Sequence, residues 1–98
     1  MSNKILVDAK LRDLVPAYLK HRDAELARLR GHLAAGDLDA LQKIGHQLCG
    51  SGGGYGFARI SELGRALERA AAEGRAEEIR KIISDLAGYL GAIELVYE

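Results

Sequence analysis

Apolar side chains recur at helical spacing in four successive stretches of the chain. These stretches cover residues 15–33, 38–48, 57–71 and 79–93, and the last can be extended toward Val96. Side chains spaced by three and four residues lie on one face of a helix, so each stretch predicts an amphipathic helix. No segment alternates apolar and polar residues over a useful length, so we expect no strands.

Proline and capping residues indicate where the helices begin. Pro16 fits only in the first turn of a helix or at a break. The first helix should therefore begin near Asp13 or Leu14, with residues 1–12 irregular or in a short extra turn. Asp37 is placed to cap the second helix, because its side chain can accept a hydrogen bond from a free backbone N–H of the first turn.

Glycines indicate where two of the helices end. Gly36 follows the first apolar stretch and Gly74 follows the third. Connections of about two to five residues make successive helices antiparallel. The chain is therefore predicted to be all-α, folded as an antiparallel up-down-up-down four-helix bundle.

The charge balance and the length exclude several classes of protein. Lysine plus arginine and aspartate plus glutamate each number 14, so the 98-residue chain has no net charge to attract nucleic acid or an anionic membrane. Its longest apolar run is too short to cross a bilayer, no signal segment opens the chain, and its single cysteine cannot form an internal disulfide. We expect one cytoplasmic domain that binds neither nucleic acid nor membrane. Apolar stripes can close one bundle or pair two, and we expect a monomer.

His46 is the candidate functional residue, because it points away from the core of its own helix. At 100° per residue it lies roughly 145° from the centre of the apolar stripe of the second helix. Gln42, Cys49, Gly50 and Gly53 share its side. The small residues one turn later leave the imidazole open to close approach by a partner.

Glycines are unusually dense around this histidine. Gly45, Gly50 and Gly52–Gly54 each weaken a helix by about 1 kcal/mol relative to alanine, which suggests that access to the imidazole matters. The alternative is that Gly50–Gly56 simply ends the helix and turns the chain. No lysine followed by serine or threonine comes after the glycines, and no strand precedes them, so they form neither a P-loop nor a dinucleotide-binding turn.

The stretch from His46 to Gly56 resembles the signature of histidine-containing phosphotransfer (HPt) domains. That signature reads H-x-[LI]-K-G-[SA], with a further glycine ten residues after the histidine, as at Gly56. Residues 57–68 are similar to the next helix of the family. The similarity extends over about residues 11–95, so the resemblance implies one HPt domain over 1–98 with this bundle core.

The resemblance implies a role for three residues. His46 corresponds to the phosphoryl acceptor and donor, and Gly50 to the small residue that opens the docking surface. Glu68 corresponds to the group that family members place against the other ring nitrogen of the histidine. A carboxylate that accepts a hydrogen bond from Nδ1–H leaves Nε2 as the free lone pair. The alternative is that Glu68 is a solvated residue paired with Arg65 or Arg69.

Cys49 departs from the family pattern, which has lysine at this position. That lysine helps to neutralise the phosphoryl group, but an exposed charge pair contributes only about 0–1 kcal/mol, so its loss should tune the reaction rather than abolish it. Lys43, one turn earlier on the other flank of His46, is a partial substitute. Cys49 and His46 are also spaced like two metal ligands, but two ligands do not make a site, and we expect no bound metal.

The mechanism implied by the resemblance is a phosphoryl relay. His46 Nε2 attacks the acyl phosphate of a receiver-domain aspartate and then passes the phosphoryl group to a second receiver. The implied partners are response-regulator receiver domains and a histidine kinase. The receiver would supply Mg²⁺, so the chain needs no cofactor of its own, and without a nucleotide-binding motif it is a phosphoryl carrier rather than a kinase. The docking patch should be centred on His46 and include Gln42, Lys43, Cys49, Gly50 and Gly53, with Tyr18 or Arg22 near its edge.

Three other functions remain open from the sequence. The first is a phosphorylation-independent adaptor, a degenerate HPt domain that binds a receiver or a histidine kinase, which the missing lysine at Cys49 favours. The second is the phosphoacceptor module of a chemotaxis-type kinase on a separate chain. The third is a generic helical bundle that oligomerises through an apolar stripe.

Overall fold

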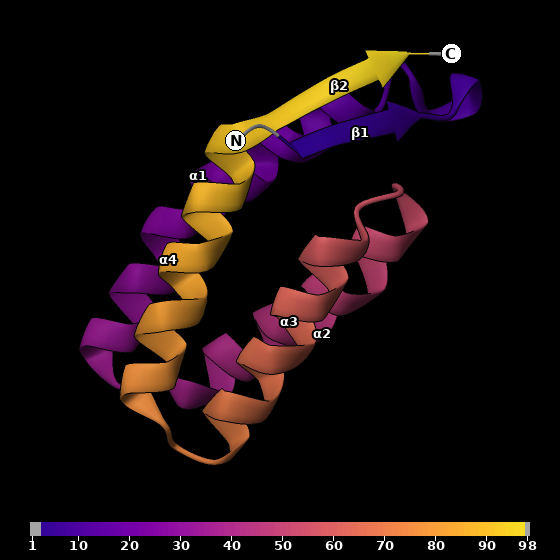
Figure 1. The fold of residues 1–98 in the computed structure, drawn as a ribbon. Helices are drawn as coiled ribbons and strands as arrows, with labels where there is room; N and C mark the ends of the chain where they lie inside the picture. Colours follow the sequence, from indigo (N-terminus) through magenta and orange to yellow (C-terminus); the bar gives the residue numbers. More distant parts are fainter. Residues whose placement is uncertain (1–2, 98) are drawn as a thin grey trace.

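The computed structural model describes residues 3–97 and contains four helices and two short strands (Figure 1). The prediction of four helices is confirmed. A single 3-10 turn, Ala9–Leu11, precedes the first helix, as the expected short extra turn. The elements are β1 (Asn3–Val7), α1 (Val15–Ala35), α2 (Leu38–Gly54), α3 (Ala58–Ala72), α4 (Ala76–Ala92) and β2 (Ile93–Tyr97).

The helix boundaries follow from the residues that flank them. Pro16 lies in the first turn of α1. Gly36 and Gly74 both have φ of 68°, a left-handed conformation that allows the chain to leave α1 and α3. The side chain of Asp37 accepts a hydrogen bond of 3.1 Å from Ala40 N and so caps α2.

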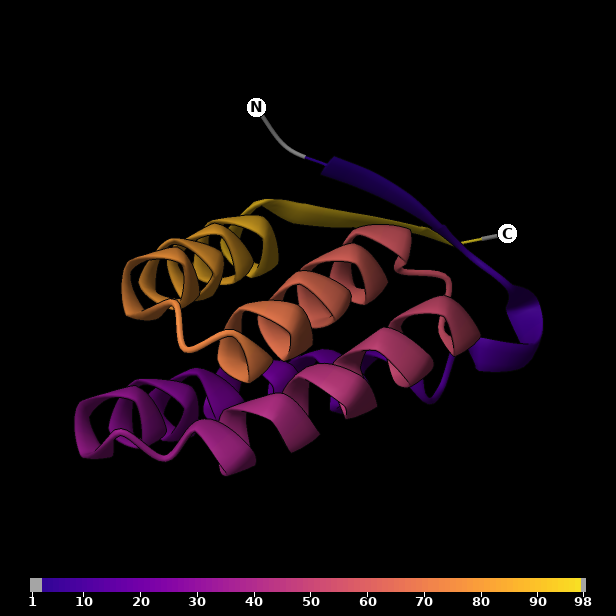
Figure 2. The same ribbon diagram turned by 90° about the horizontal axis from the view of Figure 1, so that it is seen from below.

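The four helices lie side by side (Figure 2), and one continuous core of buried side chains joins them. Phe57, at the start of α3, is fully buried and stacks on Tyr18 of α1 at a centroid distance of 5.9 Å. Every helix contributes large buried side chains, which supply most of the stabilisation of a small domain. The most completely buried of them are Val15, Leu29, Leu41, Leu48, Phe57, Ile60, Leu67, Ile79 and Leu86.

The prediction that the chain contains no strands is wrong. β1 and β2 pair in parallel, with Ile5 opposite Leu95, and α4 ends at Ala92 instead of continuing toward Val96. The two strands lie side by side across one end of the helices (Figure 1). The aliphatic side chains that prolong the apolar stripe of α4 are also good strand formers, and Val7 is buried against the bundle. Pairing between the two ends of the chain, which are distant in sequence, therefore overrides the local helical pattern.

Helices α2 and α3 pack backbone against backbone because glycines line their contact. A Cβ atom added to Gly64 of α3 would lie 2.5 Å from Cys49 N and 2.7 Å from Gly45 O. A Cβ added to Gly52 would lie 2.6 Å from Ser61 N. These positions have no room for a larger residue, and the close approach fixes how α3 lies against the histidine-bearing helix.

This packing corrects the interpretation of the glycines. Gly45 and Gly52 are buried against α3, so they serve helix packing rather than access to His46. Gly50 and Gly54 have no neighbouring atoms within 4 Å of an added Cβ and are open to solvent. The alternative, that Gly50–Gly56 ends the helix and turns the chain, agrees with the structure in part, because α2 ends at Gly54 and the chain turns at Gly56, where φ is 86°.

Candidate functional site

His46 projects from the middle of α2 into solvent beside a shallow hollow. Its side chain is 78 % exposed. The hollow has a volume of about 440 Å³, and α2 supplies every lining residue except one. These residues are Asp39, Gln42, Lys43, His46 and Gln47 from α2 and Glu68 from α3.

Glu68 is the nearest charged partner of the histidine. Its Oε2 lies 3.1 Å from His46 Nδ1. The glycine contact between the helices brings the two residues together, because an added Cβ on Gly45 would lie 2.6 Å from the backbone nitrogen of Glu68. A carboxylate can only accept, so this contact is a hydrogen bond when Nδ1 carries the proton. In the neutral ring, Nε2 is then the nitrogen with a free lone pair.

The residues predicted to surround His46 fall into two groups. Gln42 and Lys43 line the hollow with it, so the hollow itself contains an ammonium group. Cys49, Gly50 and Gly53 lie beyond the hollow on the last turns of α2, where the two glycines are exposed and the thiol is half-buried. Their roles in docking stay predictions.

Two lining residues were missed from the sequence. Asp39 lies seven positions before His46, and Gln47 directly follows it. Residues three, four and seven positions apart share one face of a helix, so the spacing of Asp39 could have identified it. Together with Glu68, Asp39 gives the hollow two carboxylates beside a single lysine.

Tyr18 or Arg22 was expected near the edge of the docking patch, and the structure covers most of both side chains. The Tyr18 ring is buried and stacks on Tyr55 at a centroid distance of 4.2 Å. The Arg22 side chain is 17 % exposed, lies over the Tyr18 ring and pairs with the buried Glu25 at 3.3 Å. Tyr18 nevertheless contacts α2 from within the bundle, because its hydroxyl lies 2.9 Å from Ser51 Oγ.

Ser61 of α3 makes a contact that the sequence did not indicate. Its hydroxyl donates to Cys49 O at 2.5 Å and accepts from Gly53 N at 2.8 Å. Those two backbone groups are four residues apart, the spacing that pairs them with each other in a regular helix. Each hydrogen bond contributes about 0.5–1.5 kcal/mol, comparable to the cost of about 1 kcal/mol for a glycine inside a helix.

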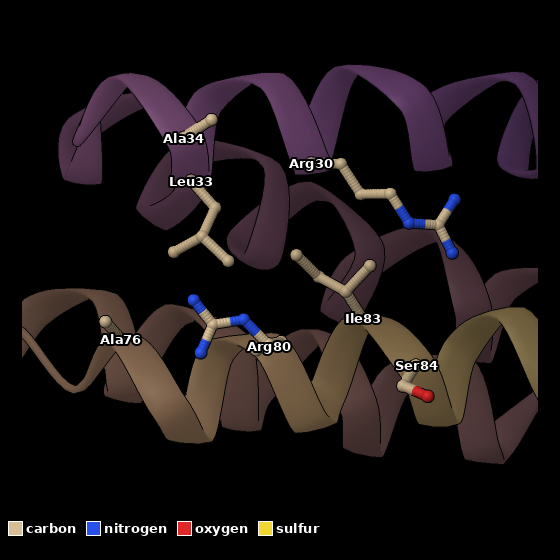
Figure 3. Close-up of a pocket in the computed structure, with 7 residues that line it drawn as sticks. All are labelled: Arg30, Leu33, Ala34, Ala76, Arg80, Ile83 and Ser84. Atoms are coloured by element: carbon tan, nitrogen blue, oxygen red, sulfur yellow. The ribbon is translucent and has the colours of Figure 1, made fainter.

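A separate groove of about 510 Å³ lies between α1 and α4 (Figure 3). Leu33 of α1 and Ile83 of α4 both project into it, and the side chains of Arg30 and Arg80 extend beside them. Arg80 is paired with Glu77. The groove contains no imidazole or thiol and shares no residue with the hollow at His46, so the candidate chemistry lies on the α2–α3 side.

Residues 3–97 contain neither a metal-binding cluster nor a membrane-spanning helix. Within residues 3–97, no three His, Cys, Asp or Glu side chains are grouped so that they could hold a metal ion. Over the same residues, no helix combines the length and apolar character needed to span a membrane.

The geometry is suited to nucleophilic attack by Nε2. The ring is accessible, and its other nitrogen lies 3.1 Å from a carboxylate oxygen, so a positive charge formed on the ring during reaction would lie beside a negative one. Attack on phosphorus generates that positive charge, so Glu68 would stabilise the product as well as orient the ring. No second imidazole, and no thiol or hydroxyl, lines the hollow.

We expect Glu68→Ala to slow phosphorylation of His46 by a small phosphoryl donor by about 1.4- to fivefold, because an exposed ion pair contributes about 0.2–1 kcal/mol. The rate would be followed by intact-mass spectrometry with phosphoramidate. Glu68→Gln keeps an acceptor oxygen and should be closer to the wild type. Glu62→Ala removes an exposed glutamate of α3 that pairs with Arg59, and is the matched control. Equal rates for Glu68→Ala and the wild type would identify Glu68 as a merely solvated residue.

Comparison with known proteins gives one clear match. The model of the Hpt domain family matches residues 13–96, which is most of the chain. Searches of curated proteins and of solved structures gave no match. The family match covers all four helices and includes both His46 and Glu68. The chain belongs to the Hpt domain family, whose members are phosphocarrier modules of two-component signalling.

Proposed function

We propose that this protein is a histidine phosphotransfer protein, folded as an antiparallel up-down-up-down bundle, that relays a phosphoryl group between His46 and receiver-domain aspartates. The observation that carries the proposal is the exposed imidazole with its Nδ1 3.1 Å from Glu68 Oε2. That arrangement leaves Nε2 free for attack and places a negative charge beside the ring that becomes positive.

The reaction exchanges one bond to phosphorus for another. His46 Nε2 forms a P–N bond while the P–O bond to the receiver aspartate breaks, and the aspartate leaves as a carboxylate. The Nδ1 proton stays on the ring, held against Glu68. Transfer to a second receiver reverses these steps. Because phosphoryl transfer depends mainly on positioning and charge stabilisation, the receiver's Mg²⁺ and lysine would supply what the carrier lacks.

The proposed partners are response-regulator receiver domains and a histidine kinase, and the protein acts as a cytoplasmic monomer. Receivers dock over the hollow and over the adjoining last turns of α2, where Gly50 and Gly53 leave the backbone exposed. Lys43, three residues before His46, is the one ammonium group that lines the hollow. The protein carries the phosphoryl group and has no kinase activity of its own.

The test is to mix the purified protein with phosphorylated receiver domains from the same genome and to record intact masses. We expect the protein to gain one phosphate that is acid-labile and alkali-stable, as phosphohistidine is. A folded protein that binds a receiver and never gains phosphate would contradict the relay.

Cys49→Lys should make receiver-dependent transfer faster by up to about fivefold, because an added exposed cation contributes at most about 1 kcal/mol to stabilising the phosphoryl group. Initial rates with one phosphorylated receiver would be compared with the wild type. Cys49→Ala removes the thiol without adding charge and serves as the control. The same acceleration in Cys49→Ala would show that the thiol, and not the missing charge, limits the rate.

Cys49 also favours a second function, a phosphorylation-independent adaptor that binds a receiver or a histidine kinase. The half-buried thiol supplies no positive charge where the family uses lysine. An adaptor would bind its partner equally well when His46 cannot be phosphorylated, and binding measured with His46→Gln separates the two functions.

A further inference from the structure

The last turns of α2 are helical although their sequence disfavours a helix. Four of the five residues from Gly50 to Gly54 are glycine, yet α2 continues through all of them. Glycine loses more backbone freedom than any other residue when a helix forms. Contacts from outside α2 must therefore stabilise this segment.

Ser61 supplies the most direct of these contacts. Its hydroxyl bridges Cys49 O and Gly53 N, and so ties the beginning of the glycine-rich segment to its end. The segment also lies directly on α3 at this point, because an added Cβ on Gly52 would be 3.0 Å from Ser61 Oγ. The Ser61 side chain of α3 is therefore hydrogen-bonded to both ends of one turn of α2.

Tyr18 of α1 makes a second contact with the same segment. Its hydroxyl lies 2.9 Å from Ser51 Oγ, and its buried ring is fixed by stacking on Tyr55. Two hydroxyl groups, one from each neighbouring helix, therefore hold a segment whose outer surface at Gly50, Gly53 and Gly54 is exposed.

We propose that Ser61 is a positioning residue for receiver docking, which keeps the exposed glycine-rich end of α2 helical so that a receiver meets a preformed surface beside His46. This inference rests on the proposed function. A partner that binds a preformed surface does not have to order it on binding. Ser61 acts through the backbone of α2 and takes no part in the chemistry at the imidazole.

The test uses Cys49, the single cysteine of the chain, to report local unfolding of the glycine-rich end of α2. In Ser61→Ala, labelling of this half-buried thiol by Ellman's reagent should become about tenfold faster, and exchange of the Gly53 amide hydrogen should accelerate similarly. Binding of a phosphorylated receiver domain from the same genome should weaken by about tenfold. Labelling of His46 by phosphoramidate, which needs no docking surface, should stay within about twofold of the wild type.

Three variants separate positioning from a general loss of stability. Ser61→Thr keeps the hydroxyl and should restore receiver binding. Gly54→Ala adds helix propensity at an open position and should partly rescue Ser61→Ala without any new hydrogen bond. Tyr18→Phe keeps the ring stacking and removes only the contact to Ser51, so it should show the same effects as Ser61→Ala, less strongly.

Each outcome bears on one part of the inference. Unchanged thiol labelling in Ser61→Ala would overturn the stabilising role of Ser61. Faster labelling with unchanged receiver binding would overturn its role in docking. Failure of the proposed function gives a different result, because no receiver would then phosphorylate the wild-type protein while the thiol and amide measurements still respond to Ser61→Ala.

Discussion

His46→Gln should abolish phosphorylation entirely, both by receiver domains and by phosphoramidate. The glutamine amide keeps polarity and approximate size but has no nitrogen lone pair that can attack phosphorus. The fold should be unaffected, because the imidazole is 78 % exposed and its hydrogen bond to Glu68 is an exposed one. We expect the melting temperature to change by no more than about 8 °C, since an exposed pair contributes less than about 1 kcal/mol.

The measurement combines intact-mass spectrometry with thermal unfolding of the same sample. His21→Gln, an exposed histidine of α1, is the matched control and should be phosphorylated like the wild type. Residual acid-labile phosphate on His46→Gln would place the acceptor on another residue. A large fall in melting temperature would identify His46 as a structural histidine.

Gly64→Ala should be the most destabilising single-methyl change in the α2–α3 contact. The added Cβ would lie 2.5 Å from Cys49 N, 2.7 Å from Gly45 O and 2.7 Å from the Leu48 Cβ. Two of these atoms belong to the backbone of α2, so the helices must separate. Overpacking of this kind costs about 1–3 kcal/mol, which for a domain of this size lowers the melting temperature by about 4–24 °C. The separation should also weaken the contact between His46 and Glu68.

Gly31→Ala is the matched control, because it adds the same methyl group to a helix where nothing lies within 4 Å. There the gain in helix propensity should stabilise the protein by about 0.5–1 kcal/mol. Urea unfolding of both variants gives the two free energies directly. A stabilised Gly64→Ala protein would mean that the two helix backbones are not in contact.

Local signals in the sequence predicted the helices well. Each of these signals affects the backbone only within one or two helical turns. As expected, Pro16 lies in the first turn of α1, Asp37 caps α2, and the glycines at positions 36 and 74 allow the chain to leave α1 and α3. The position of His46 on the outside of α2 likewise follows from helical geometry alone.

Contacts between distant segments could not be predicted in this way. Nothing in residues 3–7 or 93–97 indicates that they pair, since each run is short and apolar and fits a helix or a strand equally well. The glycines of α2 have two different roles: Gly45 and Gly52 pack closely on α3, while Gly50 and Gly54 form open surface. These roles can be told apart only when the position of α3 is known. The contact made by Ser61 has no sequence signal, because a serine on a helix face is ordinary.

The parallel strand pair also sets the order in which the protein can fold. Its register joins Asn3 to Ile93, so it closes nearly the whole chain into one loop, whereas successive helices meet across short connections. The entropic cost of closing a loop grows with its length, and contacts of high sequence separation form slowly. We therefore expect the helices to assemble first and bring the two ends of the chain together, so that β1 and β2 pair last on a bundle that is already folded.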